Sequence, residues 1–251
     1  MSVNDNTLVA VSGYAGDAHQ IENNLPGYLH HNCQVLVLSP EDAPITSMSH
    51  SSVVCRSAGL KGWIGSHTLE RQRKFLEILL SFPQEHFLFN DADSVCLSSV
   101  IPRYLYDFPD VIWSNQVTDT NPAPSRLPKI AMQPPYFLSR RSIQGMLNCA
   151  FNLPVSYYGE PQAPEGWVLP FPTECIDHWM LQAACGSGFQ SANFINGASF
   201  ETTSAAGRQG MIDQVGIFGK VMIHQVKTKE ILSELLIAHE RYCAQNPRRH
   251  E

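Results

Sequence analysis

Two aspartates separated by a single residue follow an apolar stretch in FLFNDADS, residues 87–94. Ligands of open α/β sheets bind at the carboxyl ends of strands, so a strand that ends here would present Asp91 and Asp93 at such an edge. Carboxylate oxygens are ligands that Mg²⁺ and Mn²⁺ prefer, and these cations often share their coordination with a substrate diphosphate. Aspartate is also common in solvated turns, but an apolar strand that runs directly into D-x-D favours a metal site.

Two other segments carry side chains of suitable chemistry. In MIHQVKTK, His224 ends an apolar stretch and Lys227 follows three positions later. Imidazole is an acceptable ligand for Mn²⁺, and a lysine ammonium neutralises phosphate charge. In FPTECIDHWML, the acidic residues Glu174 and Asp177 are three positions apart and would share one face of a helix. Each segment also has an ordinary structural explanation, as a half-buried histidine or as acidic residues in the first turn of a helix.

The apolar patterns around these residues predict an α/β fold. Residues 7–12 and 34–38 are apolar and β-branched, which indicates buried strands, and a helix over 17–30 between them gives the opening of a parallel sheet. The clearest helical pattern spans 66–82. Further strands are predicted over 86–90, 110–115, 136–138 and 220–226, and further helices over 139–148, 174–185 and 229–244. Irregular connections are expected over 40–58, 116–135, 152–172 and 197–219, the last of them as a mobile loop.

The composition excludes several classes of protein. The chain has 251 residues, of which 43% are hydrophobic and 16% charged, and this excludes a disordered chain, a coiled coil and a collagen-like repeat. The net charge of -6 argues against nucleic-acid binding by the whole surface, although it leaves room for a local basic groove. No apolar run approaches the roughly 18 residues of a membrane span, and no secretory signal is visible. Seven cysteines without a C-x-x-C pair are typical of reduced thiols, so we expect a cytoplasmic protein without a membrane partner.

Two enzyme classes place D-x-D after an apolar strand. The segment Asp91–Val95 fits the D-x-D-x-[TV] motif and so resembles the haloacid-dehalogenase-like phosphatases. In that family the motif normally lies on the first strand and a later acidic pair completes the metal site. Here two predicted strands precede the motif and no Asp-Asp pair occurs, which disfavours the phosphatase. The chain also lacks the glycine-rich dinucleotide and P-loop motifs and the G-x-S-x-G elbow of α/β-hydrolases.

The other class is the GT-A fold of nucleotide-sugar-dependent glycosyltransferases, which the chain resembles in several ordered segments. They are VAVSGYAGDA at 9–18, GLKGWIGSHTLERQRKFLEIL at 59–79, the D-x-D motif and the segment MIHQVKTK. The resemblance implies a single GT-A-like, Rossmann-related α/β domain over 1–251, with a mixed central sheet flanked by helices. Residues 1–95 would form its nucleotide-sugar-binding half and residues 96–251 its acceptor-side half.

The resemblance also implies roles for individual residues. Asp91, Asp93 and His224 would be the ligands of Mn²⁺ or Mg²⁺, and Asp91 and Lys227 would contact the donor. Several GT-A families use a C-terminal histidine and a nearby lysine in this way, although the H-x-x-K spacing here differs from the H-x-x-G-x-x-K pattern of one of them. In inverting members a carboxylate beside the acceptor is the general base, and Asp177 is the preferred candidate here over Glu174.

Three further residues are expected at the donor. Ser12 and Tyr14 lie in the segment that resembles the nucleoside-binding turn of the GT-A fold. In the predicted helix over 66–82, Gln72 and Arg73 interrupt an otherwise apolar face, which suggests that part of this face looks into a cleft. We therefore assign Arg73 to donor binding, with the alternative that its side chain extends to solvent.

The function implied is metal-dependent transfer of a sugar from a nucleotide sugar, with a UDP-sugar preferred, to an acceptor hydroxyl. The segment YAGDAHQIENNLPGYLHHNCQVLVLSPEDAPI resembles small phage-encoded glycosyltransferases, which makes a hydroxymethylated base in viral DNA one candidate acceptor. Such a base would have to be flipped out or single-stranded. The alternatives are a magnesium-dependent phosphatase and a non-catalytic module that binds nucleotide sugars.

Overall fold

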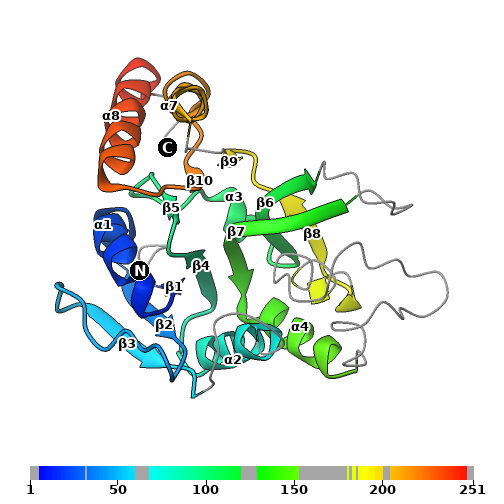
Figure 1. Ribbon diagram of the computed structural model, residues 1–251. Coiled ribbons are helices and arrows are strands. Elements are labelled where there is room, and N and C mark those ends of the chain that lie inside the picture. The colour runs from blue at the N-terminus through cyan, green and yellow to red at the C-terminus, as the bar shows by residue number, and fades with distance from the viewer. Residues whose placement is uncertain are drawn as a thin grey trace.

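A computed structural model of the chain describes residues 6–31, 33–59, 68–119, 129–152, 180, 183–184, 186–199 and 204–247 (Figure 1). The architecture is α/β, with a mixed sheet flanked by helices, and this confirms the coarser part of the prediction, the α/β class with a mixed central sheet. Among the described residues, no helix combines the length and the apolar character needed to cross a membrane. Cys33, Cys55, Cys96 and Cys243 form no disulfide bond with one another.

The large sheet has seven strands in the order β3-β2-β1-β4-β7-β6-β8. Strands β3, β2, β1 and β4 are mutually parallel, β7 is antiparallel to both β4 and β6, and β8 is parallel to β6. Among the described strands of this sheet, β7 alone therefore runs opposite to the others. The strands are β1 Thr7–Ser12, β2 Gln34–Ser39, β3 Val53–Ser57, β4 His86–Asp91, β6 Val111–Asp119, β7 Lys129–Ser139 and β8 Gln190–Asn193.

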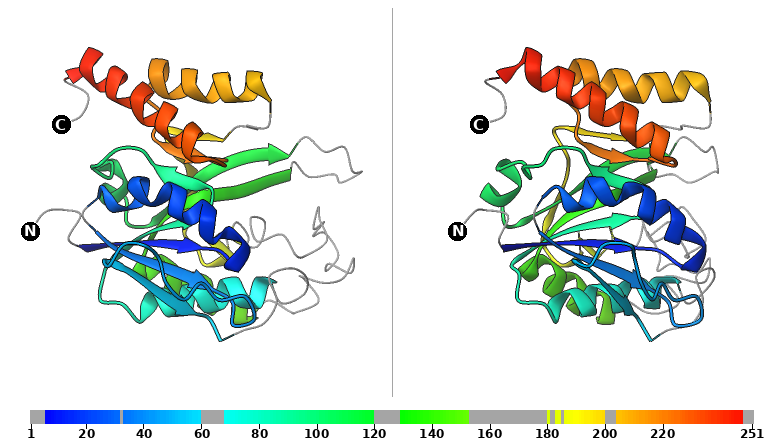
Figure 2. Two further views of the ribbon diagram at one scale, coloured as in Figure 1. Left: turned by 60° about the vertical axis from the view of Figure 1, so that its left-hand side comes forward. Right: turned by 90° about the vertical axis from the view of Figure 1, so that its left-hand side faces the viewer.

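A small three-stranded sheet lies beside the large one and is built from β5 Ser94–Cys96, β10 Met222–His224 and β9 Gly197–Ser199. Figure 2 shows helices α1, α7 and α8 on one side of the large sheet and α2 and α4 on the other. The helices are η2 Ala15–Asp17, α1 Ala18–Leu29, α2 Thr68–Leu80, α3 Tyr104–Asp107, α4 Arg140–Asn152, α7 Ala205–Phe218 and α8 Lys229–Gln245.

Successive side chains of β1 point to opposite faces of the large sheet and so contribute to two apolar clusters, one on each face. Val9 and Val11 join the apolar cluster beneath α1 and α8, whereas Leu8 and Ala10 join the cluster beneath α2 and α4. All four side chains are fully buried, which explains why this strand reads as a continuous apolar run. A strand buried on both faces holds its carboxyl end in a fixed position, and that end carries the residues considered below.

Three expectations about connections are wrong. The segment 40–58 contains the edge strand β3, which pairs with β2. The segment 197–219 is not a mobile loop but contains β9 and α7, a helix capped by the Ser204 hydroxyl and ended by Gly219 in the left-handed conformation. Its glycines reduce helix propensity, but packing of α7 on α8 outweighs this local preference. The two helices approach most closely where α7 ends, because a β-carbon on Gly219 would lie 2.4 Å from the ring of Tyr242.

The segment 116–135 is also not irregular throughout. Strand β6 continues to Asp119, and β7 begins at Lys129 and runs through the consecutive prolines Pro134 and Pro135. Proline cannot donate to a ladder, but neighbouring residues of β7 pair with β6 on one side and β4 on the other, and this tertiary pairing outweighs the local preference. The remaining irregular connection and the helix predicted over 174–185 lie largely outside the described residues.

Candidate active site at the D-x-D turn

The D-x-D motif lies at the carboxyl edge of two adjacent parallel strands. β1 and β4 pair so that Ser12 is opposite Asp91, and the Ser12 hydroxyl donates to Asp91 Oδ1 at 2.7 Å. The Ser94 hydroxyl accepts from the backbone N–H of Asp91 at 2.9 Å and so closes the turn. The two aspartates thus lie at the end of β4, where the sequence predicted them. Ser12 lies beside Asp91 because β1 and β4 end at the same edge of the sheet.

The C-terminal segment brings His224 and Lys227 to the same turn. β10 pairs antiparallel with β5, with His224 opposite Ser94. His224 Nε2 lies 3.3 Å from Asp93 Oδ1, and Lys227 Nζ lies 2.5 Å from Asp93 Oδ2. The structure therefore brings together Ser12, Asp91, Asp93, His224 and Lys227, which the sequence assigned to one site from separate segments.

The backbone after β10 has an unusual conformation that explains this convergence. Gln225 adopts a positive φ of 76°, which non-glycine residues rarely do. The turn places the N–H of the buried Val226 on the carbonyl of Asp93 at 2.7 Å. The Val226 carbonyl in turn accepts from Gln20 Nε2 at 2.5 Å and from Asn24 Nδ2 at 3.2 Å, both on α1.

Asn24 links the two turns of the site. Its Nδ2 also donates to the carbonyl of Ala92, inside the D-x-D motif, at 2.8 Å, and its side chain is completely buried. α1 therefore holds the D-x-D turn and the turn that carries Lys227 in one rigid arrangement. No sequence signal points to this role, because an asparagine inside a predicted helix has no distinctive pattern.

The two aspartates have opposite electrostatic environments. Burial disfavours ionisation of Asp93, but the hydrogen bonds and charges of His224 and Lys227 outweigh it and lower the pKa of Asp93 to about 2. Burial raises the pKa of Asp91, and the negative charge of Asp93 adds to this, against the hydrogen bond from Ser12. Two carboxylates this close favour a cation between them, because a divalent ion would relieve both the repulsion and the desolvation.

The arginine whose charge acts on this edge is Arg71 rather than Arg73. Arg71 is only 2% exposed, and burial lowers its pKa to about 10, against the opposing influence of the negative charges of Asp91, Asp17 and Asp42. Arg73 forms an ion pair with Glu77 on its own helix, at 3.6 Å. The polar pair that interrupts the apolar face of α2 is thus Arg71 and Gln72, one position earlier than the periodicity indicated.

Tyr14 also lies near this edge, immediately after β1. Its backbone N–H donates to Asp17 Oδ2 at 3.2 Å, and its ring lies close to Gly16, where the position of a β-carbon would be 2.4 Å from the ring. The pKa of Asp17 is raised, chiefly by burial. Asp177 and Glu174, the candidates for a general base, lie outside the described residues.

The possible metal ligands at this edge suit a hard divalent cation. The described residues nevertheless contain no ready-made group of three or more histidine, cysteine, aspartate or glutamate ligands. Both oxygens of Asp93 already have partners in this arrangement, the His224 imidazole at Oδ1 and the Lys227 ammonium at Oδ2. Carboxylate oxygens with one imidazole suit Mn²⁺ or Mg²⁺ better than a soft metal. A cation at Asp91 and Asp93 would therefore have to replace the contacts that these two groups now make.

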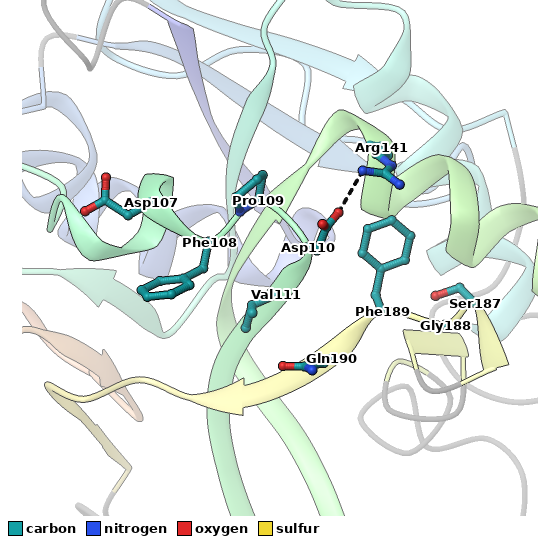
Figure 3. A pocket seen from close by; sticks show the side chains of 10 residues that line it. All are labelled: Asp107, Phe108, Pro109, Asp110, Val111, Arg141, Ser187, Gly188, Phe189 and Gln190. Carbon is teal, nitrogen blue, oxygen red and sulfur yellow. Dashed lines mark hydrogen bonds and ion pairs between the residues drawn. The ribbon is translucent and has the colours of Figure 1, made fainter.

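Two cavities lie away from this edge. One, of about 570 Å³, opens at the far end of the large sheet, where Arg141 pairs with Asp110 at 2.9 Å and Phe108 and Phe189 line the wall (Figure 3). The other, of about 700 Å³, lies at the end of the small sheet remote from His224, between α3 and α8. Neither is lined by a residue of the D-x-D cluster, so size alone does not identify the site of chemistry.

No model of a known protein family and no curated protein sequence matches this chain.

Proposed function

We propose that the chain is a metal-dependent glycosyltransferase that moves a sugar from a nucleotide-sugar donor to an acceptor hydroxyl. The observation that carries this proposal is the convergence of four side chains from two distant segments: Asp91, Asp93, His224 and Lys227. They lie at the carboxyl edge of a parallel strand pair, where nucleotide-type ligands bind in open α/β sheets. The motif follows the fourth strand in the chain, which argues against the phosphatase alternative.

The proposed mechanism uses the charges of this edge. Asp91, Asp93 and His224 would hold Mn²⁺ or Mg²⁺, which when bound supplies positive charge for the departing diphosphate. Lys227 is 46% exposed and can turn from Asp93 to a phosphate oxygen, adding a second positive charge where negative charge develops. Ser12 holds the carboxylate of Asp91 in place, and Arg71 takes the role that the sequence assigned to Arg73, as a buried cation behind the donor site.

The acceptor side of the proposal rests on Asp177. In an inverting reaction its carboxylate would take the proton of the attacking acceptor hydroxyl as the bond to the anomeric carbon forms. A protein, a glycan, a small molecule and a modified base in single-stranded or flipped-out DNA remain candidate acceptors. A UDP-sugar is the preferred donor.

A thermal-shift screen with Mn²⁺ and the diphosphates UDP, GDP, CDP and ADP tests the donor site. A ligand at 100 times its Kd stabilises the native state by about 2.7 kcal/mol, which is readily measured as a rise in Tm. We expect a rise that requires Mn²⁺ and is selective for one nucleotide, that is lost in Asp93→Ala and that is retained in the exposed control Asp107→Ala. Donor binding by Asp93→Ala equal to that of the wild type would refute the metal assignment.

Two other outcomes distinguish the alternatives. Stabilisation by phosphate mimics with Mg²⁺, but by no nucleotide, would support a phosphatase. Donor binding without transfer to any acceptor and without hydrolysis of the sugar would support a non-catalytic binding module.

A further inference from the structure

His224 is held from both sides of its ring. Nε2 faces Asp93, whereas Nδ1 lies 3.2 Å from Oε1 of Gln133 on β7. The histidine side chain is only 8% exposed, so these contacts are made in a largely dry environment. Gln133 lies in the segment expected to be irregular, and the sequence did not assign it to the site.

The chemistry of the amide fixes the role of each ring nitrogen. An amide oxygen has no hydrogen to donate, so the contact with Gln133 is a hydrogen bond only when Nδ1 carries the hydrogen. Nε2 is then the nitrogen that can offer a lone pair to a cation at Asp93. A partner of this kind on the second ring nitrogen both orients a metal-binding histidine and raises its basicity.

The frame around Gln133 fixes its distance from His224. The buried side chain of Asn115 on β6 donates to the carbonyl of Pro134, next to Gln133, at 3.2 Å. The same amide group donates to the carbonyl of Met222 on β10 at 3.2 Å. β7 and β10 are therefore tied together within two residues of Gln133 and His224.

We propose that Gln133 is a positioning residue that orients His224 toward a divalent cation at Asp91 and Asp93 and so sets the affinity of this site for the cation. The inference rests on the proposed function, because it concerns the same cation site. It adds a residue that contacts neither the cation nor the donor and acts only through the imidazole.

The test is the Kd for Mn²⁺ alone, measured by electron paramagnetic resonance on the full chain without nucleotide. Gln133→Met removes the acceptor at nearly constant volume, and Gln133→Asn keeps the amide but shortens its reach. We expect each to weaken Mn²⁺ binding by about 10-fold, the lower end of the range for such partners of metal ligands. Gln133→Glu keeps an acceptor oxygen in place and should restore affinity to within about 3-fold of the wild type.

A double variant separates positioning from a general effect on folding. If Gln133 acts through the imidazole, Gln133→Met should have no further effect on Mn²⁺ affinity in a His224→Ala background. Wild-type affinity in both Gln133→Met and Gln133→Asn, or an equal loss with and without His224, would overturn the inference while leaving the cation site intact. Failure of the wild type itself to bind Mn²⁺ would overturn both this inference and the proposed cation site.

Discussion

Replacement of Asn24 by leucine tests whether α1 holds the two turns of the site together. The change keeps the number and branching of the side-chain heavy atoms and removes two hydrogen bonds from a completely buried amide, to the carbonyls of Ala92 and Val226. Each carbonyl keeps another partner, Tyr28 at 3.3 Å for Ala92 and Gln20 at 2.5 Å for Val226, so neither is left unsatisfied. Two hydrogen bonds at about 0.5–1.5 kcal/mol each predict a loss of about 1–3 kcal/mol in the free energy of unfolding.

Urea unfolding monitored by circular dichroism measures this difference, provided the slope of the transition is unchanged. Asn23→Leu is the matched control, because Asn23 is the adjacent asparagine of the same helix and is only half-buried. We expect the control to change the free energy of unfolding by less than about 0.5 kcal/mol. An Asn24→Leu protein as stable as the control would refute the claim that this side chain joins the turns. Weaker Mn²⁺ binding in a folded Asn24→Leu protein would show that the link also matters for the site.

Three further predictions concern strain, charge and pH. At the φ of 76° of Gln225, a β-branched residue is more strained than glutamine and glycine is not strained, so Gln225→Val should lower the free energy of unfolding by about 1–2 kcal/mol and Gln225→Gly should not lower it. Urea unfolding compares the two variants. Arg71→Met should weaken binding of UDP with Mn²⁺ by about 10-fold more than Arg73→Met, measured by calorimetry, since one charge is buried at the site and the other is paired with Glu77. Burial lowers the pKa of His31 to about 3, so the unfolded chain binds a proton that the folded one excludes, and stability should fall as pH decreases from about 6.5 to 3. His31→Leu should reduce this slope in urea titrations at successive pH values, and an unchanged slope would contradict the assignment.

The strand ends of the site could be predicted because their signals are local. Val9, Val11 and the apolar run before Asp91 define buried strands, and the position of polar groups at their ends follows from the direction of the chain. The contact of His224 and Lys227 with Asp93 could be predicted only from the order of the segments that resemble the GT-A fold. No local sequence pattern indicates a contact between such distant segments.

The residues and elements that were not predicted from the sequence depend on exact helical phase or on tertiary contacts. Arg71 was missed because helical phase changes by 100° per residue, so an error of one position in the polar pair exchanges the buried Arg71 for the half-buried Arg73. Gln133 was missed because the prolines beside it disfavour a strand locally, whereas pairing of β7 with β4 and β6 imposes one. α7 was missed because its glycines lower the local helix propensity, whereas the packing against α8 that stabilises it becomes visible only when both helices are in place.

The described residues contain no ready-made group of metal ligands, yet a metal site is proposed among them, and the electrostatics of Asp93 reconcile the two. Asp93 is 15% exposed, and without a compensating charge its burial would raise its pKa rather than lower it to about 2. His224 and Lys227 compensate for the burial, so the two groups that would contact a bound cation and a bound diphosphate also stabilise the Asp93 carboxylate in this arrangement. A cation that binds at Asp93 must then release Lys227, and the released ammonium is left within reach of the site where the diphosphate would lie. Binding of the cation and of the diphosphate should therefore be cooperative, and this cooperativity should disappear in Lys227→Met, because that side chain has no charge to transfer.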